Sequence, residues 1–336
     1  MLILTGGTIG SSEHHGIISA DQNGEYRIVQ LYQQKYNDVD WTIFQPLNIL
    51  SENLNPLHWE TIVNFILGLD LNDTDGMIIT HGSDTLSYSS AMLSMCLCHL
   101  NIPVAITAAN YVPDHPKSNA LDNIRAAVLL CEHMQKGVFT VFKNADDSDC
   151  SIYLPTRMYE ADRFFDKFSS ADGKLFAKVT DDRFVICSAI EDEIRKKNKA
   201  VTDKLILRRK VMMIRPYPSL NYENIVIPSD VSAVLHTGYH SSTANADLQN
   251  KRYSALTLLD KCRRCNVDFY ISSFKKNHSS LYETGNILLH HGAVPLFDIT
   301  NESSLAKLLL LYNTNTENKQ YFLANDIYFE NMQIDR

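Results

Sequence analysis

Short apolar runs alternate with longer amphipathic segments through the first half of the chain. The runs have the length of buried strands, and the segments between them repeat their apolar residues at helical spacing. Ser83 and Asp84 stand directly before one of these segments and supply good N-cap chemistry. The pattern predicts strands at 1–5, 41–45, 77–80, 104–107 and 138–142, and helices at 57–69, 86–99 and 118–134.

This alternation predicts an α/β fold with a parallel sheet that carries helices on both faces. Ligands of such sheets collect at the carboxyl ends of the strands. Thr8 follows the first predicted strand, and Ser83 follows the strand at 77–80. We therefore expect both hydroxyls at the same edge of the sheet.

The pattern becomes polar and charged after about residue 185 and stays so through Lys210. This change predicts an N-terminal domain at 1–190, a linker at 191–210 and a smaller C-terminal α/β domain at 211–336. In the second domain the pattern predicts strands at 211–214, 225–227, 234–236 and 268–272 and helices at 245–265 and 303–312.

Composition narrows the class of protein. The 336 residues are 45% hydrophobic and 21% charged, as in ordinary globular proteins, and the net charge is −8. This charge argues against a nucleic-acid surface, and the basic residues of 195–210 fit a solvated linker. No apolar run reaches the ~18–20 residues of a membrane span. The opening run, Met1–Leu4, is too short for a signal peptide, so we expect neither leader nor membrane contact.

The seven cysteines are odd in number and scattered, which favours reduced thiols in a cytoplasmic protein over a disulfide framework. Two groups of residues have a spacing that is also found among zinc ligands: Cys96-x-Cys98-His99 and Cys262-x-x-Cys265. Each pair falls on a helical apolar pattern, where small cysteines commonly pack. We therefore expect no metal site.

Two glycine-containing segments carry the candidate chemistry. They are Leu4–Gly10, with the order Thr5-Gly6-Gly7-Thr8, and Ile79–Leu86, with the order His81-Gly82-Ser83-Asp84. Glycines let a backbone approach a ligand closely, and a hydroxyl in such a turn attacks an electrophile if a base takes its proton. Residues 11–16 are polar enough to act as a lid. Alone, each segment is also explained as a turn or a helix cap, whereas together they indicate a hydrolase.

The two segments resemble the motifs T-G-G-T-I-A/G and H-G-T-D-T of the bacterial-type asparaginase/glutaminase amidohydrolases. Further matches follow in the same order along most of the chain. They are Asp75-Gly76, the segment from Pro46 to Leu54 with Trp59, and the turn Tyr282-Glu283-Thr284-Gly285-Asn286.

The resemblance implies an asparaginase-like, two-domain α/β fold with a flavodoxin-like N-terminal parallel sheet and a smaller C-terminal α/β domain. It implies a homodimer or homotetramer, an amino-acid amide as the small-molecule substrate, and no cofactor. Thr8 would be the nucleophile that forms an acyl-enzyme. Ser51 and Asp84 would hold the α-carboxylate and α-amino groups, and Ser83 would take the place of the second threonine. Gly7, Glu52, Gly82 and Ala108 would complete the substrate site.

The sequence departs from the family pattern at three places. Ser83 replaces a threonine, which keeps the hydroxyl and loses a methyl group. Ile17 stands near the place of the lid tyrosine. The expected lysine is missing: counting back from Asp166-Lys167-Phe168 reaches Tyr159, or Arg157 after a small shift. Arginine stays protonated and is a poor base, and Lys117, Lys143 and Lys167 lack positional support.

Three alternatives remain beside a threonine amidohydrolase. Ser83 could be the nucleophile of a serine enzyme. The chain could be a catalytically impaired protein that binds an amino acid or amide as a sensor or assembly partner. Nucleotide binding by the turn at Gly6-Gly7 is disfavoured, because neither G-x-x-x-x-G-K nor G-x-G-x-x-G is present.

Overall fold

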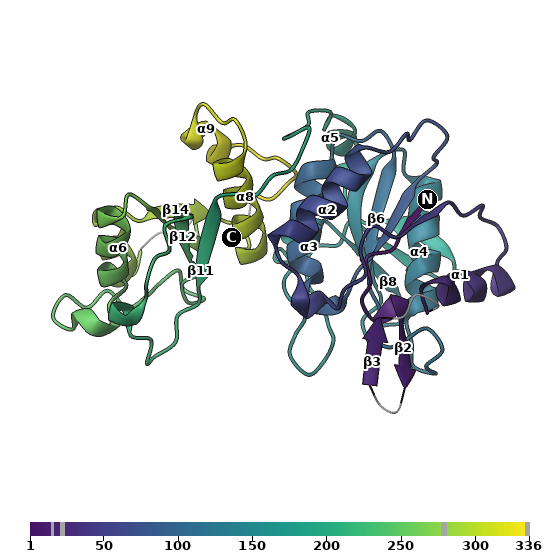
Figure 1. Cartoon of the computed structure of the whole chain (residues 1–336), viewed down its shortest axis with the longest axis horizontal. Coiled ribbons are helices and arrows are strands. Elements are labelled where there is room, and N and C mark those ends of the chain that lie inside the picture. Colours follow the sequence, from purple (N-terminus) through teal and green to yellow (C-terminus); the bar gives the residue numbers. More distant parts are fainter. Residues whose placement is uncertain (15–16, 21–23, 277–280, 333–336) are drawn as a thin grey trace. The chain divides into compact units, whose positions relative to one another are not determined.

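The computed structural model describes residues 1–14, 17–20, 24–276 and 281–332, and Figure 1 follows the chain through them. The chain forms two compact units, Met1–Leu205 and Ile206–Arg336. The boundary between them falls inside the segment 191–210, which opens with a short helix, α5 (Glu191–Arg195).

An eight-stranded sheet in the order β10-β9-β8-β7-β6-β5-β1-β4 is the centre of the N-terminal unit. Strands β4, β1, β5, β6 and β7 run parallel, as the sequence predicted. Their residues are mostly apolar, and β5, β6 and β7 are buried throughout, which is typical of parallel strands covered on both faces. The bounds are β1 (Leu2–Ile3), β4 (Ile43–Phe44), β5 (Met77–Thr80), β6 (Pro103–Thr107) and β7 (Gly137–Phe142).

The sheet is mixed, because three short strands that the sequence analysis missed extend it in antiparallel fashion. They are β8 (Cys150–Tyr153), β9 (Ala177–Thr180) and β10 (Arg183–Ile186). In β9 buried and exposed residues alternate, so this strand shows no continuous apolar run. The strands predicted at 1–5 and 41–45 are only two residues long, although backbone pairing between the two segments continues beyond them to Gly6 and Ile49.

Helices cover both faces of this sheet. On one face α2 (Pro56–Leu67) packs on α3 (Leu86–Leu97), and on the other α1 (Gly24–Lys35) packs on α4 (Ala120–His133). The three helices predicted at 57–69, 86–99 and 118–134 are therefore confirmed. Asn55 caps α2 by accepting the N–H of Leu57 at 3.0 Å, followed by Pro56 at the first helical position.

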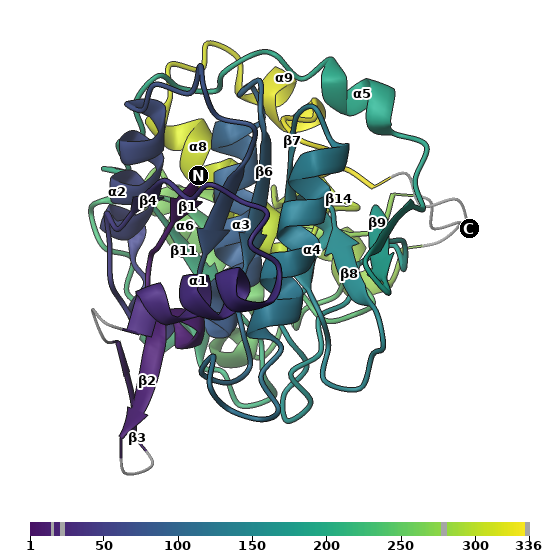
Figure 2. The ribbon, with the colours of Figure 1, turned by 90° about the vertical axis from the view of Figure 1, so that its right-hand side faces the viewer.

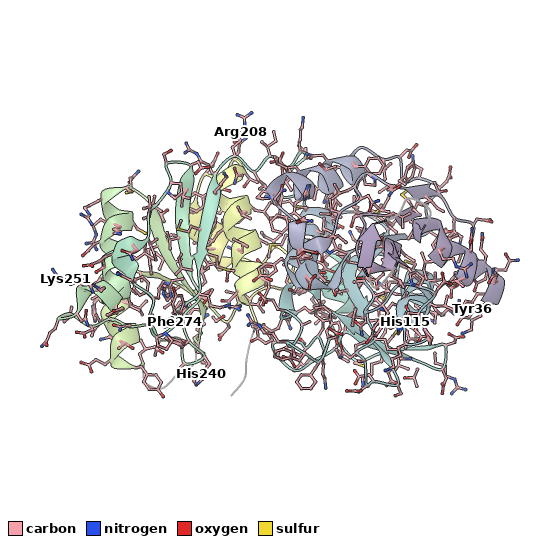
Figure 3. The ribbon with its side chains drawn as sticks, turned by 60° about the horizontal axis from the view of Figure 1, so that its bottom comes forward. Tyr36, His115, Arg208, His240, Lys251 and Phe274 are labelled. Atoms are coloured by element: carbon pink, nitrogen blue, oxygen red, sulfur yellow. The ribbon has the colours of Figure 1, made fainter. Side chains whose placement is uncertain are left out.

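The predicted lid segment is a two-stranded hairpin, β2 (Ser11–His14) and β3 (Ile17–Ala20), rather than a loop. It projects from the body of the unit in Figure 2. The hairpin leads into α1, where the Arg27 guanidinium donates to both carboxylate oxygens of Asp114 at 2.6–2.9 Å. Arg125 of α4 donates to Asp38 at 2.8 Å and lies over the ring of Tyr36, which Figure 3 labels beyond the end of α1. These contacts fasten the element that follows the lid.

The C-terminal unit contains a parallel four-stranded sheet in the order β11-β12-β13-β14. Helices α6 and α7 cover one face of this sheet, where Leu258 and Leu288 of the helices share a core with Ile271 of β13. Helix α8 covers the other face, where its Leu308 shares a core with Leu235 of β12 (Figure 1). Phe274, labelled in Figure 3, closes the first of these two cores. The bounds are β11 (Lys210–Ile214), β12 (Val231–His236), β13 (Asp268–Phe274), β14 (Val294–Phe297), α6 (Ala255–Arg264), α7 (Glu283–His290), α8 (Asn301–Asn313) and α9 (Lys319–Ala324).

Two predictions for this unit are wrong. Residues 225–227 lie outside the strands, and the helix predicted at 245–265 begins only at Ala255. Before Ala255 the side chain of Asn245 accepts the N–H of Asp247 at 3.0 Å, and Asp247 accepts the N–H of Gln249 at 2.8 Å. These local bonds compete with helical ones, so short polar side chains delay the helix.

Candidate active site

The first motif follows β1 and continues to pair with the segment that leads to Ser51. The N–H of Gly7 donates to the carbonyl of Ile49 at 2.9 Å, and the N–H of Ile49 donates to the carbonyl of Thr5 at 3.1 Å. Gly7 adopts a φ of +76°, a left-handed conformation that glycine adopts without steric cost. Thr8 then begins the 3-10 helix η1 (Thr8–Gly10).

The two glycine-containing motifs touch each other through their backbones. A Cβ atom placed on Gly7 would lie 2.4 Å from the backbone nitrogen of Gly82, which is far inside van der Waals contact. A Cβ atom on Gly82 would lie 2.4 Å from the hydroxyl oxygen of Ser51. The segments that carry Thr8, Ser51 and Ser83 therefore meet at one place, at the carboxyl ends of β1 and β5.

Hydrogen bonds hold these segments in register. The hydroxyl of Thr5 donates to the carbonyl of Thr80 at 2.6 Å, and the hydroxyl of Thr85 donates to the carbonyl of Ser51 at 3.0 Å. Ser51 opens the 3-10 helix η2 (Ser51–Asn53), and Ser83 opens η3 (Ser83–Thr85), which runs directly into α3. The site thus rests on two strand ends and one helix start, all of them rigid elements.

The side chain of His81 stabilises the turn of the second motif. Its side chain is buried, and its Nδ1 lies 2.8 Å from the carbonyl oxygen of Gly82. Burial lowers the pKa of His81, against the smaller opposing effect of this bond. The imidazole is therefore neutral and donates its Nδ1 proton to Gly82, which holds the turn before Ser83.

Ser51 and Asp84, which the sequence analysis assigned to the substrate, are neighbours in space. The buried hydroxyl of Ser51 donates to Oδ2 of Asp84 at 3.4 Å, while Asp84 itself is exposed. Glu52 is also exposed, next to Ser51 in the chain. One hydroxyl and one carboxylate are therefore presented together.

Thr8 and Ser83 are half-buried, and among the described residues no side chain bonds to either hydroxyl.

Ala108 lies fully buried directly after β6, and its carbonyl accepts a hydrogen bond from Nδ2 of Asn123 at 2.8 Å. Asn123 also accepts the N–H of Lys143 at 2.7 Å, so it ties the ends of β6 and β7 together. In the sequence this asparagine resembles a surface position, because it is a polar residue inside an amphipathic helical pattern, and it was therefore not predicted.

The lysines considered as substitutes for the missing base are engaged elsewhere or exposed. Lys143 is paired with Asp122 at 2.7 Å, and Lys117 and Lys167 are exposed. Arg157, at the end of the 3-10 helix η4 (Pro155–Arg157), pairs with Asp172 at 2.8 Å. Ile17 lies in β3, and its side chain is outside the described part of the chain.

Several hydrogen bonds stabilise the ionised carboxylate of Asp172, the partner of Arg157. Burial by itself would raise the pKa of the carboxyl, but bonds from Ser170 and from the N–H of Lys174, together with the guanidinium, outweigh it and lower the pKa. The carboxyl of Asp172 thus stays ionised at neutral pH and holds the guanidinium of Arg157. Arg157 therefore acts as a fixed positive charge and anchor, and it does not supply a base.

Within the described ranges, no three His, Cys, Asp or Glu side chains are arranged to hold a metal ion. All seven cysteines are unpaired thiols. No helix in the described part of the chain has both the length and the apolar character needed to cross a membrane.

Residues 1–190, more than half of the chain, match the family model described as Asparaginase, N-terminal. The chain belongs to the asparaginase family of amidohydrolases. Curated relatives share about a quarter of its residues. A glutamyl-tRNA(Gln) amidotransferase subunit of Methanosphaera stadtmanae is 25% identical over 78% of this chain and 60% of its own length. The corresponding protein of Saccharolobus solfataricus, with the same name, is 26% identical over 98% of this chain and 75% of its own length.

Solved structures show that the fold is shared over the whole chain. The thermostable L-asparaginase of Thermococcus kodakarensis matches with a TM-score of 0.76 at 21% identity, covering 99% of both chains. L-asparaginase I of Vibrio cholerae matches with a TM-score of 0.74 at 19% identity, covering 98% of both chains. The two-domain asparaginase-like α/β fold expected from the sequence is therefore confirmed, with a mixed rather than purely parallel first sheet.

Proposed function

We propose that this protein hydrolyses the side-chain amide of asparagine, glutamine or a related amino acid through an acyl-enzyme on Thr8. The observation that supports it is the contact between the two motifs, in which Gly7 lies against Gly82 and Gly82 lies against Ser51. The segments that carry Thr8, Ser83, Ser51 and Asp84 meet at this contact, as the proposed nucleophile, second hydroxyl and substrate-holding pair would need to do. Membership of an amidohydrolase family supports the same reaction.

In the proposed reaction the hydroxyl oxygen of Thr8 attacks the amide carbon, and the nitrogen leaves with a proton as ammonia. Water then adds to the ester, and the carbon–oxygen bond to Thr8 breaks to release the free acid. Ser51 and Asp84 hold the α-carboxylate and the α-ammonium group. Gly7, Glu52, Gly82 and Ala108 line the same site, and Ser83 serves the leaving group or the incoming water. No cofactor enters this scheme.

The test is ammonia release from asparagine, glutamine and a panel of amino-acid amides. We expect Thr8→Ala to lower kcat by ~10³-fold or more, because the covalent route is lost. Thr61→Ala is the matched control, since it removes a hydroxyl from the exposed face of α2. A Thr8→Ala variant as active as this control would contradict the proposal. Trapping the acyl group on Ser83 instead would establish the serine mechanism.

Because the expected lysine is missing, the second candidate function of the same site is binding without catalysis. An impaired homologue would retain Ser51 and Asp84 and still hold an amino acid. Asparagine or aspartate would then raise the melting temperature of the wild type without any release of ammonia. Ammonia release that disappears in Thr8→Ala excludes this reading.

The names of the curated relatives favour a more specific candidate, a component of an amidotransferase that acts on glutamyl-tRNA. The chain spans only 60–75% of these relatives, so any such assembly is a proposal. This candidate predicts a kcat/KM for glutamine well above that for asparagine. The net charge of −8 argues against direct tRNA contact by this chain. An electrophoretic mobility shift with glutamyl-tRNA tests that contact.

We further propose that the protein works in the cytoplasm as a homodimer or homotetramer. Seven unpaired thiols support a reducing compartment. Light scattering coupled to size exclusion tests the assembly, because the chain itself has a mass of 38.1 kDa. A dimer or tetramer gives two or four times this value, and a monomer at micromolar concentration contradicts the proposal.

A further inference from the structure

The C-terminal unit carries a depression that the proposed hydrolysis does not use. Its volume is about 870 Å³, which is within the range of small-molecule sites. Its lining comes from the segments that follow β11 and β12 and from the first turn of α7. The depression therefore lies at the carboxyl ends of parallel strands, the edge at which open α/β sheets bind their ligands.

Five tyrosines line this depression: Tyr217, Tyr222, Tyr239, Tyr253 and Tyr282. Tyr222 is buried, whereas Tyr217, Tyr239 and Tyr282 are 55%, 40% and 63% exposed. Leu248 belongs to the same lining and is also largely exposed. A group of exposed large apolar side chains on one surface marks a binding site. The faces of aromatic rings attract apolar groups and cations.

Hydrogen bonds fix the loop after β12, which contributes most of the lining. The N–H of Tyr239 donates to the carbonyl of Thr243 at 2.7 Å, which closes the first turn of the loop. The N–H of Ala255, at the start of α6, donates to the carbonyl of Asn245 at 2.7 Å. The loop is therefore fastened within itself and to the next helix, so the depression is a preformed feature of this unit.

The two charged residues of the described lining are both acidic, Asp247 and Glu283. Both are exposed, and Oδ1 of Asp247 accepts the N–H of Gln249 at 2.8 Å, which orients this carboxylate. Glu283 is the first residue of α7. A carboxylate in the first turn offsets the positive end of a helix, which by itself would favour an anion. The lining thus presents negative charge beside aromatic rings.

Basic residues near this part of the chain are bound elsewhere or lie outside the lining. Arg252 pairs with Glu223 at 3.5 Å, and Nζ of Lys261 donates to the carbonyls of residues 222, 223 and 225 at 2.6–3.2 Å. Three further basic residues are chain neighbours of the lining without belonging to it: Arg215, His240 and Lys251, the last two labelled in Figure 3. The charge of the lining therefore disfavours phosphates and carboxylates and favours a cation.

We propose that this depression binds a small organic cation, an ammonium group that carries alkyl substituents. The charged nitrogen lies over the faces of the tyrosine rings, the alkyl groups pack against the rings and Leu248, and Asp247 and Glu283 balance the charge. Metal ions fit less well, because Ca²⁺ and Mg²⁺ require several oxygen ligands and the described lining offers two carboxylates. This site goes beyond the proposed hydrolysis and does not depend on it.

The test is a ligand-observed NMR titration of the full chain with choline and with neohexyl alcohol, an uncharged isostere in which carbon replaces the charged nitrogen. We expect the Kd of choline to be at least about tenfold lower than that of the alcohol, because the ring faces and carboxylates attract only the charged form. Binding should leave ammonia release from an amide substrate as a separate measurement.

Variants of the lining test the same site. Tyr239→Leu and Tyr282→Leu are each expected to raise the Kd of choline about tenfold, because each loses a ring face. Tyr321→Leu is the matched control, since this tyrosine is 68% exposed in α9 and lies outside the lining. Glu283→Gln is expected to raise the Kd several-fold, with the exposed Glu317→Gln as its control.

Three results overturn the proposal. Choline that does not bind at millimolar concentration excludes the site. Equal Kd values for choline and the alcohol show an apolar depression without preference for charge. A Kd that stays within twofold in Tyr239→Leu, Tyr282→Leu and Glu283→Gln places choline elsewhere on the protein. Absence of ammonia release with choline still bound contradicts the proposed function alone.

Discussion

At the scale of single residues, the candidate site depends on two positions that have no side chain. The backbones of Gly7 and Gly82 are in direct contact, and the hydroxyl of Ser51 fills the space where a methyl group on Gly82 would lie. A substituent at Gly82 would also meet the Cβ of Ser51 at 2.5 Å, so rotation of the hydroxyl alone would not relieve the clash. The geometry of three segments therefore depends on one missing Cβ atom.

We expect Gly82→Ala to destabilise the protein by about 1–3 kcal/mol, the usual effect of forcing a methyl group into a packed site. Activity should fall further, because Ser51 and Ser83 shift relative to Thr8. Gly68→Ala is the control: its new Cβ atom meets carbonyl oxygens at 3.4–3.5 Å, an ordinary contact. Urea unfolding and ammonia release measure both effects. Equal behaviour of the two variants would show that the close approach is not required.

At the scale of elements, a buried ion pair joins α8 to the segment that follows α9. Nζ of Lys307 lies 2.7 Å from Oε1 of Glu330, and both side chains are almost fully buried, at 1% and 0% exposure. Lys307 also donates to the carbonyls of Leu323 and Asn325, and the Glu330 carboxylate accepts the N–H groups of Ile327 and Tyr328. Backbone groups therefore complete the coordination of both charges.

Removing one member of such a pair leaves the other charge buried and uncompensated. We expect Glu330→Gln to lower the free energy of unfolding by about 3–5 kcal/mol. Asp230→Asn breaks the pair between Lys210 and Asp230, whose side chains are 58% and 45% exposed. That control should cost less than about 1 kcal/mol. Denaturant titration measures both, and similar losses would mean that the buried pair contributes no more than the surface pair.

At the scale of the whole molecule, the C-terminal unit carries a group that ties stability to pH. His236 ends β12 fully buried; its Nε2 lies 2.8 Å from the Tyr222 hydroxyl, and its Nδ1 accepts the N–H of Gly238. Burial lowers the pKa of His236 from 6.5 to about 4. The imidazole is therefore neutral in the folded state, with its proton on Nε2.

Below pH 6.5 the unfolded chain binds a proton on His236 that the folded chain does not bind until about pH 4. Stability is therefore lost as the pH falls through this window, by up to about 3 kcal/mol. We expect the calorimetric transition of the C-terminal unit to move to lower temperature between pH 7 and pH 5. This shift should be much smaller in His236→Gln. Tyr222→Phe keeps the histidine and should keep the shift. An unchanged pH dependence in His236→Gln would assign the effect to other groups.

The sequence by itself determined the parts of this protein that depend on local pattern. Apolar runs located β5, β6 and β7, and helical spacing located α2, α3 and α4. A strand buried on both faces is a continuous apolar run, and a helix with one buried face repeats its apolar residues at helical spacing, so both are visible in consecutive residues. The short strands β8–β10 and the late start of α6 were missed. Four-residue strands are too short to show a clear period, and side-chain competition with the backbone leaves a weak local signal at a helix start. The order of the two glycine motifs, with the matches that follow them, was enough to recognise the family.

Only the tertiary structure decided which residues share the candidate site. It brought Ser51 to Asp84 across 33 positions of the chain. It also paired Lys143 with Asp122 and Arg157 with Asp172, which removes both cations from the list of possible bases. Such contacts arise from strand order and helix packing. A sequence pattern records which residues can be buried, whereas the distance between two side chains depends on how the elements between them fold.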